Sequence, residues 1–144
     1  MNIIITNIHK EEAWEIRHKV MWPDKEFEFI KLDNDESGIH YGLYKDNQIV
    51  SVLSLFVTNN EGQFRKFATL SEEQGNGFGS VLLNYVIKEG VNLGLKRIWC
   101  NAREQKVGFY QKFGMQATGE GFMKAGKAYI IMEMTLNNVK SIPL

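Results

Sequence analysis

The spacing of apolar and polar residues along the chain predicts alternating strands and helices. Residues 2–8 are rich in β-branched side chains and predict a first strand. Apolar side chains recur at helical spacing over residues 10–21, which predicts a helix that ends before Pro23. Residues 25–32 fit either a helix or a loop. The chain therefore opens with a strand and a helix, followed by a segment whose structure the pattern leaves open.

Three further apolar segments predict an antiparallel meander. They cover residues 39–45, 48–58 and 63–70. Asp46-Asn47 lies between the first two segments and is a favourable hairpin turn. Residues 59–62, with the sequence NNEG, supply a second turn.

A long helical pattern follows a glycine-rich stretch, QGNGFGS, at residues 74–80. Apolar residues and glycines recur on one face of the predicted helix: Gly79, Leu82, Leu83, Val86, Ile87, Gly90, Leu93 and Gly94. The opposite face carries polar residues: Asn84, Lys88 and Asn92. This amphipathic pattern predicts a helix that packs against a sheet.

The last third of the chain predicts shorter elements. These are a strand at 96–100, a helix at 105–113 ended by Gly114, and two strands at 115–118 and 128–136. The whole pattern predicts a mixed sheet with helices packed on it, an α+β or α/β fold. We expect one domain over residues 1–136 and a loosely tied tail over residues 137–144.

Composition limits the classes of function. The chain has 144 residues, of which 24% are charged and 44% apolar, as is ordinary for a globular domain. Its 17 Lys and Arg balance its 17 Asp and Glu, so nothing suggests a long-range field for nucleic acid or an anionic membrane. The apolar run near the start is too short for a signal peptide or a spanning helix, and we expect a cytoplasmic protein. A single cysteine, Cys100, excludes an internal disulfide and is too few for a cysteine zinc site.

The glycine-rich stretch lies where a strand leads into a helix. Backbone N–H groups have no partners within the helix there, and the helix dipole is positive. Glycines at this point let a phosphate approach several amides at once. The alternative is a tight turn in which Gly79 serves only close packing. Short glycine motifs also occur by chance, so the stretch alone leaves both interpretations open.

Two common phosphate loops do not fit this stretch. A P-loop ends in Gly-Lys-Ser/Thr, whereas Gly79 is followed directly by Ser80. A dinucleotide fingerprint needs a glycine where Ser80 stands. It also needs an acidic residue at the end of the next strand, where this chain has Cys100-Asn101.

The pattern Gln74-x-x-Gly77-x-Gly79 resembles the R/Q-x-x-G-x-G/A signature of the GNAT superfamily of N-acetyltransferases. In that family the signature binds the pyrophosphate of acetyl-coenzyme A (acetyl-CoA). Residues 101–115, NAREQKVGFYQKFGM, resemble the family's second motif, whose short helix carries a Phe-Tyr or Leu-Tyr pair. Residues 128–136, AYIIMEMTL, resemble its last strand. The resemblance covers roughly residues 1–136.

The resemblance implies a mixed, mostly antiparallel sheet of about six to seven strands, flanked by about four helices. It also implies acetyl-CoA as cosubstrate, with no metal. The implied coenzyme-binding residues are Phe67, Ala68, Thr69, Gln74, Gly75, Asn76, Gly77, Phe78, Gly79, Ser80, Arg103 and Tyr110. The chain departs from the family at Arg103, where many members have a coenzyme-contacting asparagine, and at Lys106, where alanine is common. Asn101 lies two residues too early to take the role of that asparagine.

Acetyl transfer to an amine needs a neutral amine, a thioester carbonyl held close to it, and a proton for the leaving thiolate. Backbone amides near Thr69 are candidates to polarise the carbonyl. Tyr110 is the best candidate for the general acid, because a phenol is a neutral donor near pH 7. The alternative for Tyr110 is a packing role beside Phe109.

No general base is evident from the sequence. We expect Glu72 and Glu73 to be solvated, His40 to be a satisfied strand histidine, and Cys100 to be buried and inert. Glu133 faces either the substrate or solvent. The spacing of His9 and His18 does not predict a metal site. Four aromatic residues belong either to the core or to an acceptor pocket: Trp14, Trp22, Phe27 and Phe29.

The sequence therefore predicts an N-acetyltransferase that moves an acetyl group from acetyl-CoA to a primary amine. The acceptor is expected to be a small molecule or a peptide, without nucleic acid or membrane partners, and the protein a monomer or homodimer. One alternative is a non-catalytic acyl-CoA-binding or sensing domain on the same fold. The other is a structural module whose glycines form only a turn.

Overall fold

The computed structural model describes residues 1–136, so the predicted tail lies outside the described residues. The strands are β1 (Ile3–Ile8), β2 (Ile39–Lys45), β3 (Gln48–Thr58), β4 (Glu61–Thr69), β5 (Arg97–Arg103), β6 (Gln116–Lys124) and β7 (Lys127–Thr135). The helices are α1 (Lys10–Met21), α2 (Phe78–Asn92) and α3 (Val107–Gln111). Short 3-10 helices are η1 (Phe27–Ile30), η2 (Asp35–Ser37), η3 (Ser71–Glu73) and η4 (Glu104–Lys106).

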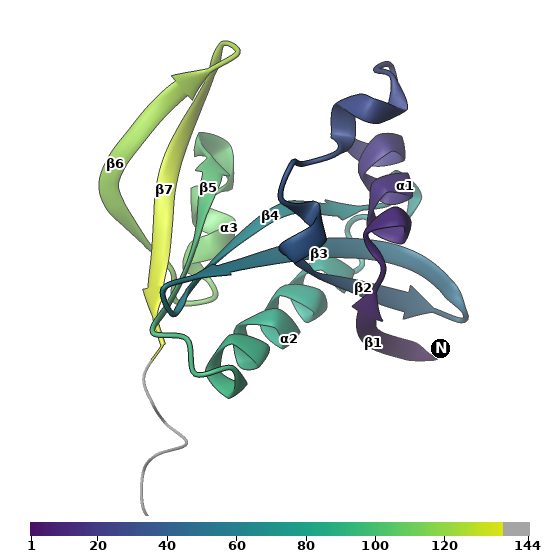
Figure 1. The fold of residues 1–144 in the computed structure, drawn as a ribbon, viewed down its shortest axis with the longest axis horizontal. Helices are drawn as coiled ribbons and strands as arrows, with labels where there is room; N and C mark the ends of the chain where they lie inside the picture. Colours follow the sequence, from purple (N-terminus) through teal and green to yellow (C-terminus); the bar gives the residue numbers. More distant parts are fainter. Residues whose placement is uncertain (137–144) are drawn as a thin grey trace, which may run out of the picture. The chain divides into compact units, whose positions relative to one another are not determined.

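The sheet has seven strands in the order β1-β2-β3-β4-β5-β7-β6 (Figure 1). β4 and β5 pair in parallel, and β1–β2, β2–β3, β5–β7 and β6–β7 pair antiparallel. This confirms the predicted mixed, mostly antiparallel sheet. The chain divides into two compact units. The first unit comprises Met1–Phe56 and Phe64–Val86, and the second comprises Val57–Gln63 and the chain from Ile87 onward. A single domain over residues 1–136 stays a prediction.

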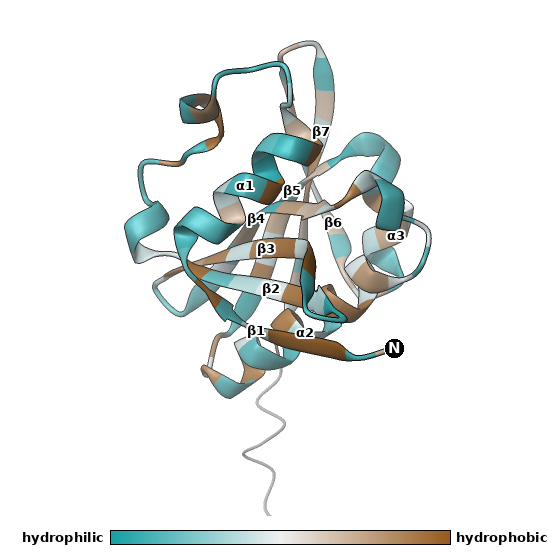
Figure 2. Ribbon diagram, turned by 90° about the vertical axis from the view of Figure 1, so that its right-hand side faces the viewer, coloured by the Kyte–Doolittle hydropathy of each residue, from teal (hydrophilic) through white to brown (hydrophobic). Residues whose placement is uncertain are grey.

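In the first unit, the β2–β3 hairpin forms as predicted. Asp46 and Asn47 have φ angles of 49° and 72°, as a two-residue hairpin turn of type I′ requires. Residues 50–56 of β3 are buried throughout, and Figure 2 colours much of this strand as hydrophobic. In β2, the His40 side chain reaches the backbone of η2, whereas the neighbouring Tyr41 ring contacts Tyr85 of α2. Successive strand residues point to opposite faces, so both faces of β2 are covered.

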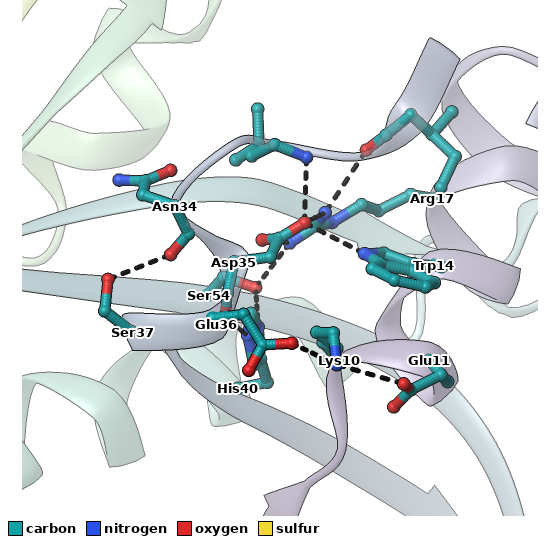
Figure 3. A network of polar contacts seen from close by, with 12 residues as sticks. Lys10, Glu11, Trp14, Arg17, Asn34, Asp35, Glu36, Ser37, His40 and Ser54 are labelled. Atoms are coloured by element: carbon teal, nitrogen blue, oxygen red, sulfur yellow. Dashed lines mark hydrogen bonds and ion pairs between the residues drawn. The ribbon is translucent and has the colours of Figure 1, made fainter. Parts of the chain in front are cut away.

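A buried ion pair joins α1 to the segment before β2 (Figure 3). Arg17 is fully buried and Asp35 is 3% exposed. The guanidinium donates to both carboxylate oxygens, with Nη1–Oδ2 at 2.8 Å and Nη2–Oδ1 at 2.9 Å. It also donates to the Ile30 carbonyl at 3.2 Å and to Ser54 Oγ at 3.0 Å. The sequence pattern does not identify this arginine, which lies next to Ile16 on the buried face of α1.

Further hydrogen bonds surround Asp35. Trp14 Nε1 and the Leu32 amide both donate to its Oδ2, at 2.9 and 2.8 Å. Burial by itself would raise the pKa of Asp35. The hydrogen bonds from Arg17, the Leu32 amide and an indole, with the Arg17 charge, outweigh burial and lower this pKa to about 2. Asp35 is therefore a buried carboxylate that stays ionised over the physiological pH range.

In the second unit, β5 pairs with β4 on one side and β7 on the other, and β6 is the edge strand. Figure 1 shows the β6–β7 hairpin in yellow-green beside β5. Its turn is Ala125-Gly126, with φ angles of 51° and 76°. The prediction of a strand at 115–118 is wrong in extent, because β6 runs to Lys124. Almost all of β6 is exposed, so it lacks the apolar alternation by which a strand is recognised.

The predicted buried face of α2 is correct through Gly90 but wrong at Leu93 and Gly94. The helix ends at Asn92, and Leu93 is 50% exposed. The Leu95 amide bonds to the Gly90 carbonyl and the Gly94 amide bonds to the Val91 carbonyl. With Gly94 at φ 77°, this is a Schellman motif.

Smaller boundary errors remain elsewhere. The segment left open at 25–32 contains the 3-10 helix η1, and β4 begins at Glu61, two residues earlier than predicted. β5 continues to Arg103, beyond the predicted end at residue 100. The helix predicted over 105–113 is divided between η4 and the five-residue α3.

Candidate functional site

The glycines at the start of α2 and in the loop before it differ in backbone conformation and in the space around them. Gly75 and Gly77 have φ angles of 85° and 84°, in the left-handed region that favours glycine. A Cβ atom at either position would meet no heavy atom within 4 Å. Both residues therefore shape the loop without being packed against other residues, and they leave space at its surface.

Gly79 serves a different purpose. Its φ angle is not positive, and a Cβ atom there would lie 3.3 Å from Phe67 Cζ and 3.4 Å from Thr69 Oγ1. Glycine thus allows the first turn of α2 to pack closely against the end of β4. The two interpretations of the stretch apply to different glycines: Gly79 serves packing, and the other two shape the loop.

Hydrogen bonds hold the loop between β4 and α2 in place. Gln74 Nε2 donates to the Thr69 carbonyl at 3.0 Å, and the Leu70 amide donates to the Val50 carbonyl of β3 at 2.8 Å. The Val81 amide bonds to the Gly77 carbonyl at 3.1 Å. The amides of residues 78–80 lie ahead of this bond, so they have no acceptor within the helix. Amides at a helix N-terminus, beside two open glycines, suit an anion such as a diphosphate.

The end of β4 has an unusual backbone. Lys66 has a φ angle of 57°, which is uncommon for a residue other than glycine. The following residues Ala68 and Thr69 are tied to β3 through Ser51, whose Oγ donates to the Ala68 carbonyl at 3.2 Å and lies 2.9 Å from Thr69 Oγ1. The sequence gives no signal for this left-handed angle, because lysine has no preference for a left-handed conformation.

A lysine from β2 lies beside the loop. Lys45 Nζ is 3.0 and 3.1 Å from the two carboxylate oxygens of Glu73 in η3. It also lies 5.8 Å from the ring centroid of Phe78, the first residue of α2. Glu72 is exposed as expected, but the expectation that Glu73 is solvated is wrong, since its side chain is 14% exposed. The sequence did not identify Lys45, because it lies far from the loop along the chain.

Two of the predicted site residues belong to the second unit. Arg103, half-buried, ends β5 and precedes η4. Tyr110 lies in α3, where its ring meets the Phe109 ring edge-on at 5.2 Å. Burial, and next the charge that Cys100 would carry, raise the pKa of Tyr110 above its ordinary value. The phenol therefore keeps its proton near pH 7, as a proton donor must.

Other candidates from the sequence have structural partners. Cys100 is buried as expected, and burial raises the pKa of its thiol to about 12, so little reactive thiolate is expected near pH 7. His40 is buried between Ser54 Oγ at 2.7 Å and the Asp35 carbonyl at 2.9 Å, which confirms a satisfied strand histidine. Glu133 pairs with Arg97 at 2.6 Å.

The four aromatic residues near α1 are not core residues. Three of them are exposed by 36% or more: Trp22, Phe27 and Phe29. The half-buried Trp14 meets Phe27 edge-on at 6.3 Å. The core alternative is therefore wrong for these residues, and the acceptor-pocket alternative stays a prediction.

The described chain offers neither a metal site nor a membrane-spanning helix, and a hollow in it is lined by residues other than those predicted for the site. Within residues 1–136, three or more metal-binding side chains do not gather at any point. In the same range, no helix is long and apolar enough to cross a membrane. A hollow of about 270 Å³ is lined by Gly114, Gln116, Glu133, Met134 and Thr135. None of these residues belongs to the predicted catalytic or coenzyme-binding set, and Glu133 was considered only as facing either the substrate or solvent.

Comparison with known proteins agrees with the sequence motifs. A family model described as an acetyltransferase (GNAT) domain matches residues 5–136. YitI of Bacillus subtilis strain 168, described as an uncharacterized N-acetyltransferase, is 30% identical over 142 residues, covering 92% of this chain and 95% of YitI.

Solved structures show the same fold. A protein from Lactobacillus plantarum described as an N-acetyltransferase has a TM-score of 0.85 at 17% identity, covering 95% of this chain and 100% of its own. A GNAT family acetyltransferase from Elizabethkingia anophelis, solved with acetyl-CoA bound, has a TM-score of 0.75 at 21% identity, covering 94% and 99%. The chain therefore belongs to the GNAT acetyltransferase family.

Proposed function

We propose that this protein is an acetyl-CoA-dependent N-acetyltransferase that acts on a primary amine. The observation that carries the proposal is the loop before α2, in which Gly75 and Gly77 adopt left-handed backbone angles with open space around them. This loop fits the diphosphate of coenzyme A, because it presents helix N-terminal amides to an anion. Membership of the GNAT family supports the same ligand.

The proposed coenzyme site uses the backbone more than side chains. The amides of residues 75–80 would hold the diphosphate, with Gln74 fixing the loop to Thr69. The backbone of residues 67–69 would hold the pantetheine arm. Arg103 is proposed as a further coenzyme contact. Acetyl-CoA would supply the activated acyl group.

The proposed reaction is direct transfer between the thioester and the amine. The amine nitrogen forms a bond to the acetyl carbon, the carbon–sulfur bond breaks, and the nitrogen loses a proton to solvent. Tyr110 gives its phenolic proton to the departing sulfur and recovers one from water. The burial that raises the pKa of this phenol also disfavours a thiolate in the same surroundings, so transfer of the proton is less uphill than the phenol's pKa alone implies.

The acceptor class follows from the balanced charge of the chain. A net charge of zero gives no field for nucleic acid or lipid headgroups, so we propose a small-molecule or peptide amine. We also propose a cytoplasmic location and a monomer or homodimer, as the sequence leads us to expect.

The test is release of free thiol from acetyl-CoA with a panel of primary amines, comparing the wild type with Tyr110→Phe. Phenylalanine keeps the ring and removes the proton, so kcat should fall about 10²–10³-fold while the KM for acetyl-CoA changes little. Tyr44→Phe is the matched control. Its hydroxyl donates to Glu12 at 3.0 Å and has no proposed catalytic role, so turnover should be kept.

The outcomes separate the parts of the proposal. Full activity in Tyr110→Phe would show that water protonates the thiolate and that this tyrosine only packs. Binding of coenzyme A without thiol release for any amine in the panel would favour the non-catalytic acyl-CoA-binding domain. A melting temperature that stays unchanged in excess coenzyme A would contradict the coenzyme site itself, because a ligand of the folded state must raise stability.

A further inference from the structure

Lys45 is placed to meet a ligand of the glycine loop, although it belongs to a distant part of the sequence. Its ammonium group lies between η3, which leads into the loop, and Phe78, which follows the loop. The Lys45 side chain is 31% exposed and that of Glu73 is 14% exposed. The pair is therefore partly shielded but still accessible to solvent.

The loop has no cation of its own. Residues 71–80, with the sequence SEEQGNGFGS, contain two glutamates and neither lysine nor arginine. A diphosphate brought to this loop would be near the carboxylates of the two glutamates, and like charges at a few ångströms repel. Backbone amides offset part of this cost. A lysine contributed by a neighbouring strand offsets more of it, because lysine binds phosphate as a point charge.

We propose that Lys45 is the cation that binds the diphosphate of the coenzyme, and that Glu73 competes with the diphosphate for it. This inference rests on the proposed function. The ammonium group has three donors, and it contacts both carboxylate oxygens of Glu73. Binding of coenzyme exchanges one anionic partner for another, so Glu73 lowers the affinity. Weaker binding favours the release of coenzyme A after transfer.

The alternative is that the pair only ties η3 to the end of β2 and so holds the loop in shape. The two ideas predict different signs. If the pair only holds the loop in shape, removal of either partner destabilises the loop, and both variants bind coenzyme more weakly. If Glu73 competes with the diphosphate, removal of Lys45 weakens binding whereas removal of the Glu73 charge strengthens it.

The experiment is calorimetric titration of the full chain with coenzyme A and with dephospho-coenzyme A, which keeps the diphosphate but lacks the 3′-phosphate. The variants are Lys45→Met, which keeps an apolar stem over Phe78, and Glu73→Gln. Glu72→Gln is the matched control, because it removes the same charge from the neighbouring residue, whose side chain is exposed. The circular dichroism spectrum of each variant reports whether it is folded.

We expect Lys45→Met to weaken binding of both ligands about five- to tenfold, and Glu73→Gln to strengthen it about two- to fivefold. Glu72→Gln should change affinity less than Glu73→Gln. Both main effects should shrink in high salt, because ions screen partly exposed charges.

Three results would overturn the inference. Weaker coenzyme binding in Glu73→Gln would show that the ion pair only holds the loop in shape. Equal gains in affinity in Glu72→Gln and Glu73→Gln would show that any lost negative charge near the loop has the same effect. Dependence on Lys45 that disappears with dephospho-coenzyme A would exclude the diphosphate as its partner. If the wild type binds coenzyme A and either variant fails in this way, the proposed function stands without the inference. If the wild type does not bind coenzyme A, both fail.

Discussion

Two ion pairs in the first unit use the same chemistry in different surroundings. Arg17 and Asp35 have side chains 0% and 3% exposed, whereas Lys45 and Glu73 are 31% and 14% exposed. The first pair makes additional hydrogen bonds (Figure 3): an indole and a backbone amide donate to Asp35, and Arg17 donates to a backbone carbonyl and to a serine hydroxyl oxygen. The second pair lies beside the glycine loop.

The difference indicates which pair serves the fold and which can serve a ligand. A fully buried ion pair is costly to form, and it tolerates the loss of neither partner, because the other charge is then left without compensation. No ligand can reach it without unfolding that part of the chain. A partly exposed pair contributes little to stability but can exchange partners at low cost. The Arg17–Asp35 pair thus stabilises the fold, whereas Lys45 and Glu73 can separate at low cost when a ligand competes for the lysine.

The largest expected effect is on stability, from Arg17→Met. This variant leaves Asp35 ionised and buried without its bidentate partner, so it should lower the free energy of unfolding by about 3–5 kcal/mol. Lys45→Met is the matched comparison and should cost less than about 1 kcal/mol. Urea unfolding followed by circular dichroism measures both.

A second variant tests whether the ion pair alone explains the loss. Arg17→Met combined with Asp35→Leu removes both charges but leaves Trp14 Nε1 and the Leu32 amide without their acceptor. It should therefore recover only part of the lost stability.

For the comparison of the single variants, equal losses of stability in Arg17→Met and Lys45→Met would show that burial does not distinguish the two pairs.

A smaller effect is expected from acid. The folded-state pKa of Asp35 is lowered to about 2, below its value in an unfolded chain. The stability that this shift contributes is therefore complete above about pH 4 and is lost as the pH falls towards 2. The amount is roughly 2 kcal/mol for a depression of this size. Unfolding free energies of the wild type and Asp35→Asn, measured from pH 5 downward, should converge. Parallel pH profiles would contradict this role of Asp35.

Much of the fold could be predicted because its elements follow simple periodicities. The β2–β3 hairpin has strong alternation and a turn pair that tolerates left-handed angles, and α1 and β3 match their predicted bounds. β6 could not be predicted in full, because an exposed edge strand has no buried face to impose a pattern. The end of α2 was missed because Leu93 continues the apolar spacing although Gly94 has already ended the helix.

The candidate site could be predicted only where it is continuous along the chain. The glycine loop is a local motif, and its position between β4 and α2 follows from the pattern. Lys45 could not be found, because its position beside the loop depends on the pairing of β2 and β3 and not on nearby sequence. The left-handed angle at Lys66 also could not be found, since the residue type does not indicate it. The role of Arg17 could not be predicted for the same reason. A charged residue on a buried helix face can be explained only when the structure shows its partner.

Calorimetric titration of Gly77→Val with coenzyme A is the sharpest test of whether the glycine loop binds the coenzyme. Gly126→Val is the matched control, because Gly126 has a similar positive φ of 76° and open surroundings but lies in the β6–β7 turn. Both variants should lose about 1 kcal/mol or more of stability through backbone strain. We expect Gly77→Val to weaken coenzyme binding more than about tenfold and Gly126→Val to leave it unchanged, since only the former puts a side chain where phosphate meets amides. Wild-type affinity in folded Gly77→Val would contradict the account.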